Sequence, residues 1–168
     1  MGKVIAITNQ KGGVGKTTTS VNLSACLAKS GKKVLMLDLD PQGNASSGLG
    51  IDKDSLESCI YDVLIDGEDI ANIIQLTMLK NLFVAPATIQ LAGAEVELVG
   101  IVSRETILKK ALKSIKKEYD FIIIDCPPSL GLLTLNALTA ADSALIPIQC
   151  EFYALEGVSP LVTTITIV

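Results

Sequence analysis

Short apolar runs rich in β-branched residues recur along the chain, separated by turn residues or by segments with helical spacing. Such runs are typical of buried strands in a parallel sheet that helices cover on both faces. The sequence predicts five strands, at residues 3–9, 34–39, 81–86, 120–125 and 143–148. Because strands alternate with helices, we expect an α/β fold of three layers around a doubly wound, mostly parallel sheet with right-handed crossovers.

Three helical segments are predicted between these strands. Apolar positions among small polar residues indicate a helix over 17–29, and residues 104–118 have the spacing of an amphipathic helix. Residues 56–74 predict a helix in two pieces, broken near Gly67. The segment 40–50 is dense in Gly, Ser, Asn and Pro, which predicts a loop long enough to move or to carry function.

The end of the chain, at 163–168, is apolar and β-branched. This composition favours a strand, so we expect an unpaired strand edge there. The chain stops without a turn, a cap or a polar finish, which predicts a truncated or altered C-terminus. Residues 1–168 are expected to form a single domain.

The composition limits the chemistry that this domain can perform. The chain of 168 residues contains no histidine, which excludes a Ser-His-Asp triad, a Cys-His pair and His-ligated zinc. Catalysis must therefore use carboxylates, lysines, hydroxyls, thiols or backbone amides. Neither a secretory signal nor an apolar run long enough to span a membrane is visible, which predicts a cytoplasmic protein. Reduced and mostly buried thiols are expected at Cys26, Cys59, Cys126 and Cys150.

A glycine-rich segment links the first predicted strand to the first predicted helix. Its glycines let successive backbone N–H groups turn toward an anion, and the helix N-terminus adds positive potential. The ammonium of Lys16 can neutralise phosphate charge, and the hydroxyl of Thr17 can bind Mg²⁺. A glycine-rich turn with solvent-facing lysines is the alternative, but the strand-loop-helix context favours a phosphate-binding loop. Its residues are Lys11, Gly12, Gly13, Val14, Gly15, Lys16, Thr17 and Thr18.

Acidic residues stand at the ends of two predicted strands. Asp38 and Asp40 belong to the end of the second strand, and Asp125 ends the fourth. Acids at the carboxyl ends of parallel strands face the crevice where ligands bind. Carboxylates beside phosphate would repel the ligand, so we expect Mg²⁺ to be obligatory. Alternatively, Asp38 or Asp125 caps a helix or pairs with a lysine.

The phosphate-binding loop departs from the general Walker pattern. Gln10 stands five residues before Gly15, where that pattern asks for glycine, and an extra lysine follows at Lys11. The segment KGGVGKT resembles the deviant Walker motif of the ParA/MinD branch of P-loop ATPases. The segments VLMLDLDPQGN at 34–44 and FIIIDCPPSLGLLTLNAL at 121–138 are similar to the ParA/Soj proteins that partition chromosomes and plasmids. The resemblance covers almost the whole chain.

This resemblance implies a Mg²⁺-dependent P-loop ATPase that binds ATP and ADP, and whose C-terminal portion is missing here. It implies that Asp40 orients the attacking water, that Asp125 supports Mg²⁺, and that Lys11 reaches the nucleotide of the partner subunit. Asp38 is a second candidate for the shell of the metal. From the residues alone, Lys11 is equally a surface lysine or a phosphate contact within its own subunit.

The resemblance also implies partners. It implies a homodimer with ATP, nonspecific DNA binding through the full-length protein, and a ParB/Spo0J-like partner protein. The protein would then be nucleoid-associated if its DNA binding survives, and no membrane contact is expected. Two other functions stay open: a MinD-like ATPase that cycles on a membrane, and a non-catalytic nucleotide-binding fragment.

A lysine stripe follows one face of the predicted helix at 104–118. It could contact DNA phosphates or an acidic partner, or be the solvated face of the helix. The formal net charge of −4 and the 4% content of aromatic residues favour the solvated face. The lysine stripe consists of Lys109, Lys110, Lys113, Lys116 and Lys117.

Two features follow Asp125 directly. Pro127 and Pro128 restrict the backbone, which suits either a reporter of the γ-phosphate or a simple end to the strand. Cys126 invites comparison with the nitrogenase iron proteins, whose cysteines bridge a cluster between subunits. One thiol is not a cluster pattern, so buried packing is expected for it.

Overall fold

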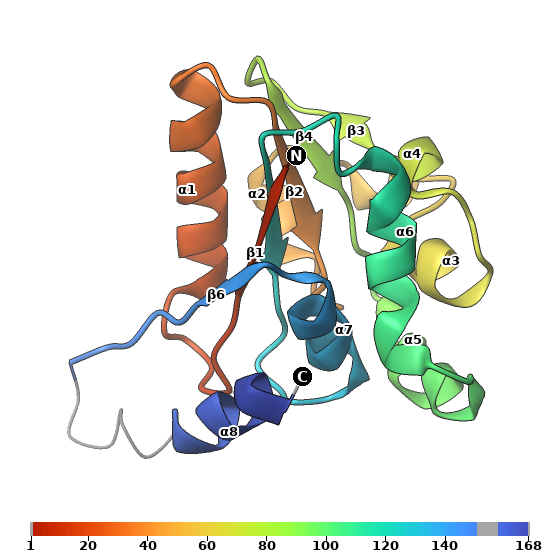
Figure 1. Cartoon of the computed structure of the whole chain (residues 1–168). Helices are drawn as coiled ribbons and strands as arrows, with labels where there is room; N and C mark the ends of the chain where they lie inside the picture. Colours follow the sequence, from red (N-terminus) through yellow and green to blue (C-terminus); the bar gives the residue numbers. More distant parts are fainter. Residues whose placement is uncertain (1, 151–157, 168) are drawn as a thin grey trace.

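A six-stranded sheet organises the chain in the computed structural model, which describes residues 2–150 and 158–167 (Figure 1). Its strands lie in the order β3-β4-β2-β5-β1-β6. Neighbouring strands are parallel except at one edge, where β3 pairs antiparallel with β4. The strands are β1 (Lys3–Ile7), β2 (Val34–Asp38), β3 (Gln75–Leu76), β4 (Leu82–Ala85), β5 (Phe121–Asp125) and β6 (Ser143–Leu145).

Helices cover both faces of this sheet (Figure 1). One apolar core lies between the sheet and α1 and α2, and a larger one lies between the opposite face and α3 to α8. These layers confirm the predicted three-layer α/β fold. No helix in the described part of the chain is long and apolar enough to cross a membrane. The α-helices are α1 (Lys16–Lys29), α2 (Asn44–Gly48), α3 (Ile60–Ile65), α4 (Ile70–Ile73), α5 (Leu91–Glu97), α6 (Ile107–Ile115), α7 (Leu132–Ala140) and α8 (Ser159–Ile167), and short 3₁₀ turns occupy Lys53–Ser55, Leu98–Gly100 and Arg104–Thr106.

The register of the central strands determines which residues meet at the carboxyl edge of the sheet. Asp125 of β5 lies opposite Ile7 of β1 on one side and opposite Asp38 of β2 on the other. All five residues of β2 are buried, as expected for a parallel strand covered on both faces. The loop that follows β1 therefore begins beside the buried Asp125, and the buried Asp38 lies one strand further along the sheet.

The helices agree only in part with the sequence prediction. The helical region predicted over 56–74 does form two pieces, α3 and α4, and Gly67 between them has a φ of +74°. The predicted loop at 40–50 contains the short helix α2. Helices α5 and α7 were not predicted, and α7 is buried around most of its circumference, so it lacks the alternation that marks an amphipathic helix.

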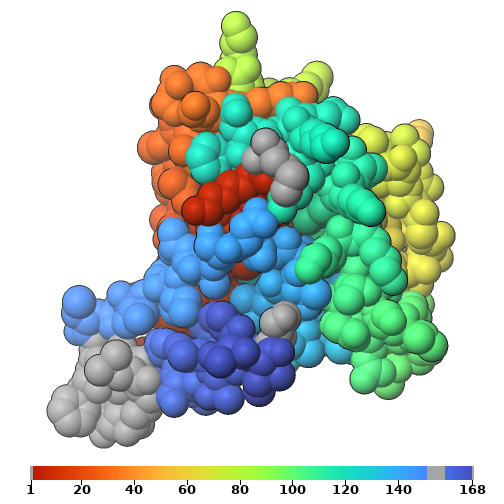
Figure 2. Space-filling view, viewed as in Figure 1, coloured from red at the N-terminus to blue at the C-terminus, as the bar shows by residue number. Residues whose placement is uncertain are grey.

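The strand edge expected at 163–168 is wrong for the described residues, which belong to α8. Pro160 stands in the first turn of this helix, where its missing N–H costs nothing. The hydroxyls of Thr163, Thr164 and Thr166 donate to the carbonyls four residues earlier, at 2.8–3.1 Å. Leu161 is fully buried against the larger core, and Figure 2 shows α8 packed on the body of the protein. Tertiary packing thus overrides the β-branched composition.

The expectation of mostly buried thiols is correct for only half of the cysteines. Cys59 and Cys126 are buried, whereas Cys26 and Cys150 are exposed. The buried face of α1 is formed at a spacing of four residues by Lys16, Ser20, Ser24 and Ala28. Cys26 lies two residues from that stripe, so the helical periodicity turns it away from the sheet.

Candidate phosphate-binding site

The loop between β1 and α1 has the backbone geometry of an anion site. Gly13 and Gly15 have φ angles of +73° and +90°, a region that side chains other than glycine rarely adopt. Gly15 caps α1 without a side-chain hydrogen bond, so the first amides of the helix are available to a ligand. A cavity of about 380 Å³ opens here, lined by Gly12, Gly13, Gly15, Lys16, Thr17, Thr18, Asp40, Gln42, Asn44 and Pro128.

Lys16 carries the positive charge of this cavity. Its side chain is only 7% exposed, and its Nζ donates to the carbonyl oxygen of Lys11 at 3.0 Å. Burial lowers the pKa of Lys16, and the nearby Asp125 and Asp40 carboxylates act in the opposite direction. Because burial leaves this ammonium poorly hydrated, an anionic ligand stabilises its charged form.

Asp125 lies under the loop at the end of β5 and is fully buried. Its Oδ1 accepts a hydrogen bond from Ser20 Oγ at 2.7 Å, while its Oδ2 has no hydrogen-bond partner among the described residues. Burial raises the pKa of Asp125, and the hydroxyls of Ser20 and Thr17 oppose that rise. A buried carboxylate oxygen without a donor is costly unless a cation or water meets it. With the Thr17 hydroxyl, this oxygen fits the all-oxygen donor set that Mg²⁺ prefers.

Asp38 lies opposite Asp125 in the sheet, but both of its carboxylate oxygens accept hydrogen bonds. Its Oδ2 accepts hydrogen bonds from both the amide and the hydroxyl of Ser46, at 2.8 and 2.7 Å. Its Oδ1 accepts from the amide of Asp40 at 3.2 Å. Burial raises the pKa of Asp38 to about 7. Asp38 thus holds the segment from Asp40 to α2 in place, and its role at a metal stays a prediction.

Asp40 and Lys11 occupy opposite environments. Asp40 is 9% exposed, lines the cavity, and accepts a hydrogen bond from the amide of Gln42 at 2.9 Å. Lys11 is exposed, and its backbone amide donates to Asn9 Oδ1 at 3.0 Å. The structure therefore brings together Lys16, Asp40 and Asp125, and it leaves the Lys11 side chain at the surface.

Sequence reasoning missed three polar residues that support this site. Ser20 holds Asp125, Ser46 holds Asp38, and Asn9 ties the loop to the segment after β6 by donating to the carbonyl of Pro147 at 2.8 Å. The four-residue step from Lys16 to Ser20 was the available signal, because it places both on one face of a helix. No local pattern pairs Asn9 with a carbonyl 138 residues away.

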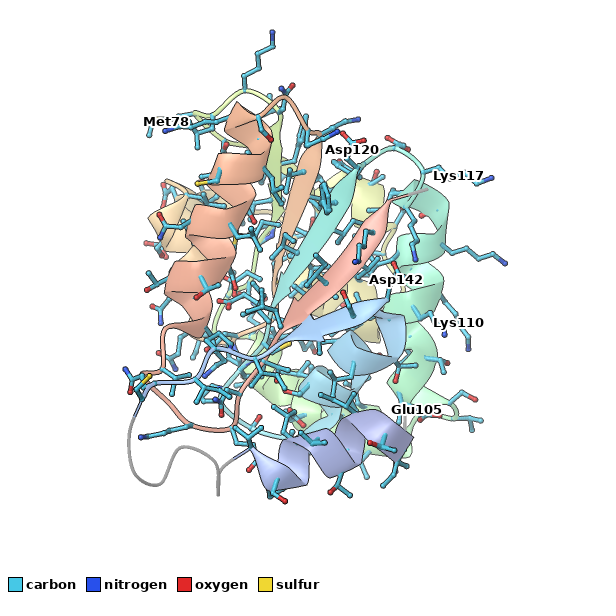
Figure 3. All side chains as sticks on the ribbon, turned by 60° about the vertical axis from the view of Figure 1, so that its left-hand side comes forward. Met78, Glu105, Lys110, Lys117, Asp120 and Asp142 are labelled. Atoms are coloured by element: carbon cyan, nitrogen blue, oxygen red, sulfur yellow. The ribbon has the colours of Figure 1, made fainter. Side chains whose placement is uncertain are left out.

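The lysine stripe lies on α6 and the residues just after it, away from the loop. Lys109, Lys110, Lys113 and Lys117 are exposed, and Lys110 and Lys117 lie on the outer side of the helix (Figure 3). Lys116 pairs with Asp142 at 2.9 Å. These exposed positions are compatible with a solvated helix face, and contact of the lysine stripe with DNA or an acidic partner stays an open alternative.

Cys126 is buried beside Asp125, with 1% of its surface exposed. Burial raises the pKa of its thiol, and the neighbouring Asp125 acts in the same direction. A thiol that does not ionise is a poor nucleophile and a poor metal ligand, which agrees with the packing role expected from the sequence.

Comparison with known proteins places this site in a family. The family model described as AAA domain matches residues 2–168, so the chain belongs to this family of P-loop proteins. Among individual proteins, the chain is 67% identical over its full length to the sporulation initiation inhibitor protein Soj of Bacillus subtilis. It is 58% identical to the chromosome partitioning protein ParA of Myxococcus xanthus. These matches confirm the resemblance to ParA and Soj. The chain spans 66% of the length of that Soj and 59% of that ParA.

Solved structures share the fold. A cobyrinic acid a,c-diamide synthase from Mycobacterium smegmatis with bound ADP and magnesium has a TM-score of 0.95 and 44% identity, over 99% of this chain and 68% of that one. A plasmid partition protein from Borrelia burgdorferi bound to AMPPNP has a TM-score of 0.88 and 31% identity, over 99% of this chain and 69% of that one. Both likenesses cover nearly all of the chain, which confirms the P-loop fold.

Proposed function

We propose that this chain is the nucleotide-binding part of a Mg²⁺-dependent ATPase that acts as an ATP-driven dimerisation switch in chromosome or plasmid partitioning. The observation that carries the proposal is the buried Oδ2 of Asp125, which has no hydrogen-bond partner among the described residues and lies at the base of a glycine loop that also holds Lys16. The relatives named for partitioning, at 67% and 58% identity, support the biological setting. They favour it over a membrane-cycling ATPase and over a non-catalytic fragment.

The residues of the site have distinct roles in this proposal. Lys16 and the amides of residues 12–18 hold the phosphates, and Thr17 and Asp125 hold Mg²⁺, with Asp38 as a further candidate. The cation, when bound, neutralises charge that develops on the phosphates. Support comes from the buried Lys16 ammonium, whose charge is poorly solvated before a ligand arrives.

Asp40 positions the attacking water. It lines the phosphate cavity, and the amide of Gln42 fixes one of its oxygens at 2.9 Å. A carboxylate held in this way can accept a hydrogen bond from water and orient it for in-line attack. Lys11, which is exposed on the glycine-rich loop after β1, stabilises developing charge on the nucleotide of a second copy of the chain.

The partners follow from the same proposal. Mg·ATP joins two copies, and hydrolysis separates them. A ParB/Spo0J-like protein stimulates turnover, and the full-length protein binds DNA without sequence preference, in the cytoplasm at the nucleoid. The names of the ParA and Soj relatives support this setting, because they refer to chromosome partitioning.

Asp40→Ala tests the proposal, since blocked hydrolysis traps the ATP-bound state. The mass of the variant is measured by light scattering after size exclusion, with Mg·ATP, with Mg·ADP and without nucleotide. We expect the Asp40→Ala variant to be a dimer only in the presence of Mg·ATP, to retain ATP binding and to lose turnover. Asp54→Ala is the matched control, because it removes the same charge from an exposed position outside the cavity. A monomer in all three conditions, or normal turnover by Asp40→Ala, contradicts the proposal.

A further inference from the structure

The start of α7 lacks a local cap, although it is the next element after the phosphate site. The segment 126–131 leads from Asp125 to α7 and includes Pro128, which lines the phosphate cavity. Gly131 occupies the cap position and has no side chain to offer. The first amides of a helix need acceptors from elsewhere, so this end of α7 depends on another part of the chain.

Glu95 of α5 supplies both acceptors. Its Oε2 accepts a hydrogen bond from the amide of Leu132 at 2.8 Å, and its Oε1 accepts from the amide of Leu133 at 3.3 Å. A carboxylate is the group that a helix N-terminus favours most, and the hydrogen bonds are charge-assisted. A Cβ atom at Gly131 would collide with both carboxylate oxygens of Glu95. Glycine at this position is therefore part of the contact.

Helix α7 is also fixed on its other side. Asn136 Oδ1 accepts from the amide of Leu108 at 3.1 Å, and its Nδ2 donates to the carbonyl of Arg104 at 2.8 Å. Asn136 is fully buried, so these hydrogen bonds do not compete with water. With α7 fixed between α5 and α6, the segment 126–131 is held at the sheet by the amide of Cys126, which donates to the carbonyl of Ile7 at 3.1 Å. At the helix it is held by Glu95 and by the Thr134 hydroxyl, which donates to the carbonyl of Ser129 at 2.7 Å.

We propose that Glu95 is a positioning residue of the nucleotide site, which sets where Pro128 stands at the cavity and thereby the preference for triphosphate over diphosphate. Glu95 lies outside the residues that line the cavity and acts through the segment 126–131. The inference rests on the proposed function, because it requires that the cavity bind a nucleotide. Glu95 comes from α5, an element without a sequence motif, and would influence phosphate binding without contacting the phosphates.

Glu95→Ala and Glu95→Gln test this role by calorimetric titration with Mg·ADP and with Mg·AMPPNP. We expect Glu95→Ala to bind AMPPNP about tenfold more weakly with ADP affinity nearly unchanged, and Glu95→Gln to lie between it and the wild type. Gly131→Ala should reproduce the loss, and the double variant should be no worse than either single one, because both remove the same contact. Glu97→Ala is the matched control on α5, where the carboxylate accepts a hydrogen bond only from the Tyr61 hydroxyl among the described residues.

The outcomes separate this inference from the proposed function. A wild-type chain that binds neither nucleotide overturns the proposed function and the inference with it. A wild-type chain that prefers AMPPNP, together with variants that lose both affinities equally or lose only thermal stability, overturns the inference alone, because Glu95 is then a structural cap. Glu95→Gln keeps one acceptor oxygen, so it carries the comparison should Glu95→Ala fail to fold.

Discussion

The hydroxyl of Ser46 connects two buried groups, and its removal should destabilise the chain in a pH-dependent manner. Ser46 Oγ donates to Asp38 Oδ2 at 2.7 Å and accepts from the amide of Ala87 at 3.1 Å. Ser46 and Asp38 are both fully buried. Ser46→Ala leaves the Ala87 amide without its acceptor and removes one of the hydrogen bonds that favour the ionised form of Asp38.

The pKa of Asp38 determines how the loss depends on pH. Burial raises the pKa of Asp38 to about 7 from its ordinary value of 3.8, so the folded state holds this proton more tightly than the unfolded chain. Its favourable contribution to folding is complete at low pH and is lost as the pH rises through about 7. Without the Ser46 hydroxyl the pKa rises further, so the loss continues above pH 7. We expect Ser46→Ala to cost about 2 kcal/mol near pH 5.5 and about 4 kcal/mol near pH 8.5.

Urea unfolding followed by far-ultraviolet circular dichroism measures this difference, without nucleotide and with EDTA present. The chain has no tryptophan, so fluorescence is the poorer probe. Ser47→Ala is the control, since Ser47 is exposed on the same short helix, and it should change the free energy of unfolding little at either pH. An equal loss at both pH values refutes the assignment of the effect to Asp38. A loss no larger than that of Ser47→Ala refutes the buried network altogether.

Two further substitutions test the phosphate-binding loop, at Lys16, and the contacts of Asp142, the residue before β6. Lys16→Ala should abolish nucleotide binding, as measured by calorimetry. Lys29→Ala is the control, because Lys29 is at the exposed end of the same helix, and it should preserve binding. Undiminished nucleotide affinity in Lys16→Ala would remove Lys16 from the site. Asp142→Asn should lower the free energy of unfolding by about 1 kcal/mol at neutral pH, as measured by urea unfolding. Against its partial burial, the amide of Val4 and the ammonium of Lys116 lower the pKa of Asp142, so its contribution is complete at neutral pH and the difference should disappear as the pH falls through that lowered pKa.

Local patterns predicted the central strands and the loop because each of them depends on neighbouring residues. The strand β2 is an apolar run that ends in Asp38, and the glycines of 12–15 take backbone angles that their own residue type allows. Both are decided within a few residues of sequence. The strand order, by contrast, places β5 between β1 and β2, which no local pattern specifies.

The missed elements are those that tertiary contacts define. Helix α7 has apolar residues on every side because it is covered by its neighbours, so its sequence shows no polar face. Its cap, Glu95, is 37 residues from Leu132, the first residue of the helix. At 163–167, β-branched residues form a helix because Leu161 is buried against the core. In each case the deciding partner lies far away in the sequence.

Asp38 and Asp125 look alike in the sequence and lie opposite each other in the sheet, yet the structure divides their tasks. Burial raises the pKa of both, so burial disfavours the ionised form of each carboxyl. Asp38 has hydrogen-bond donors for both oxygens and thereby fixes the loop that carries Asp40. Asp125 leaves Oδ2 without a donor among the described residues, and Lys16 and Thr17 both act on its carboxyl group. Hydrogen bonds meet both oxygens of Asp38, whereas one oxygen of Asp125 is left to a cation or a water, and for this reason we infer that Asp125 is the acid that meets the cation.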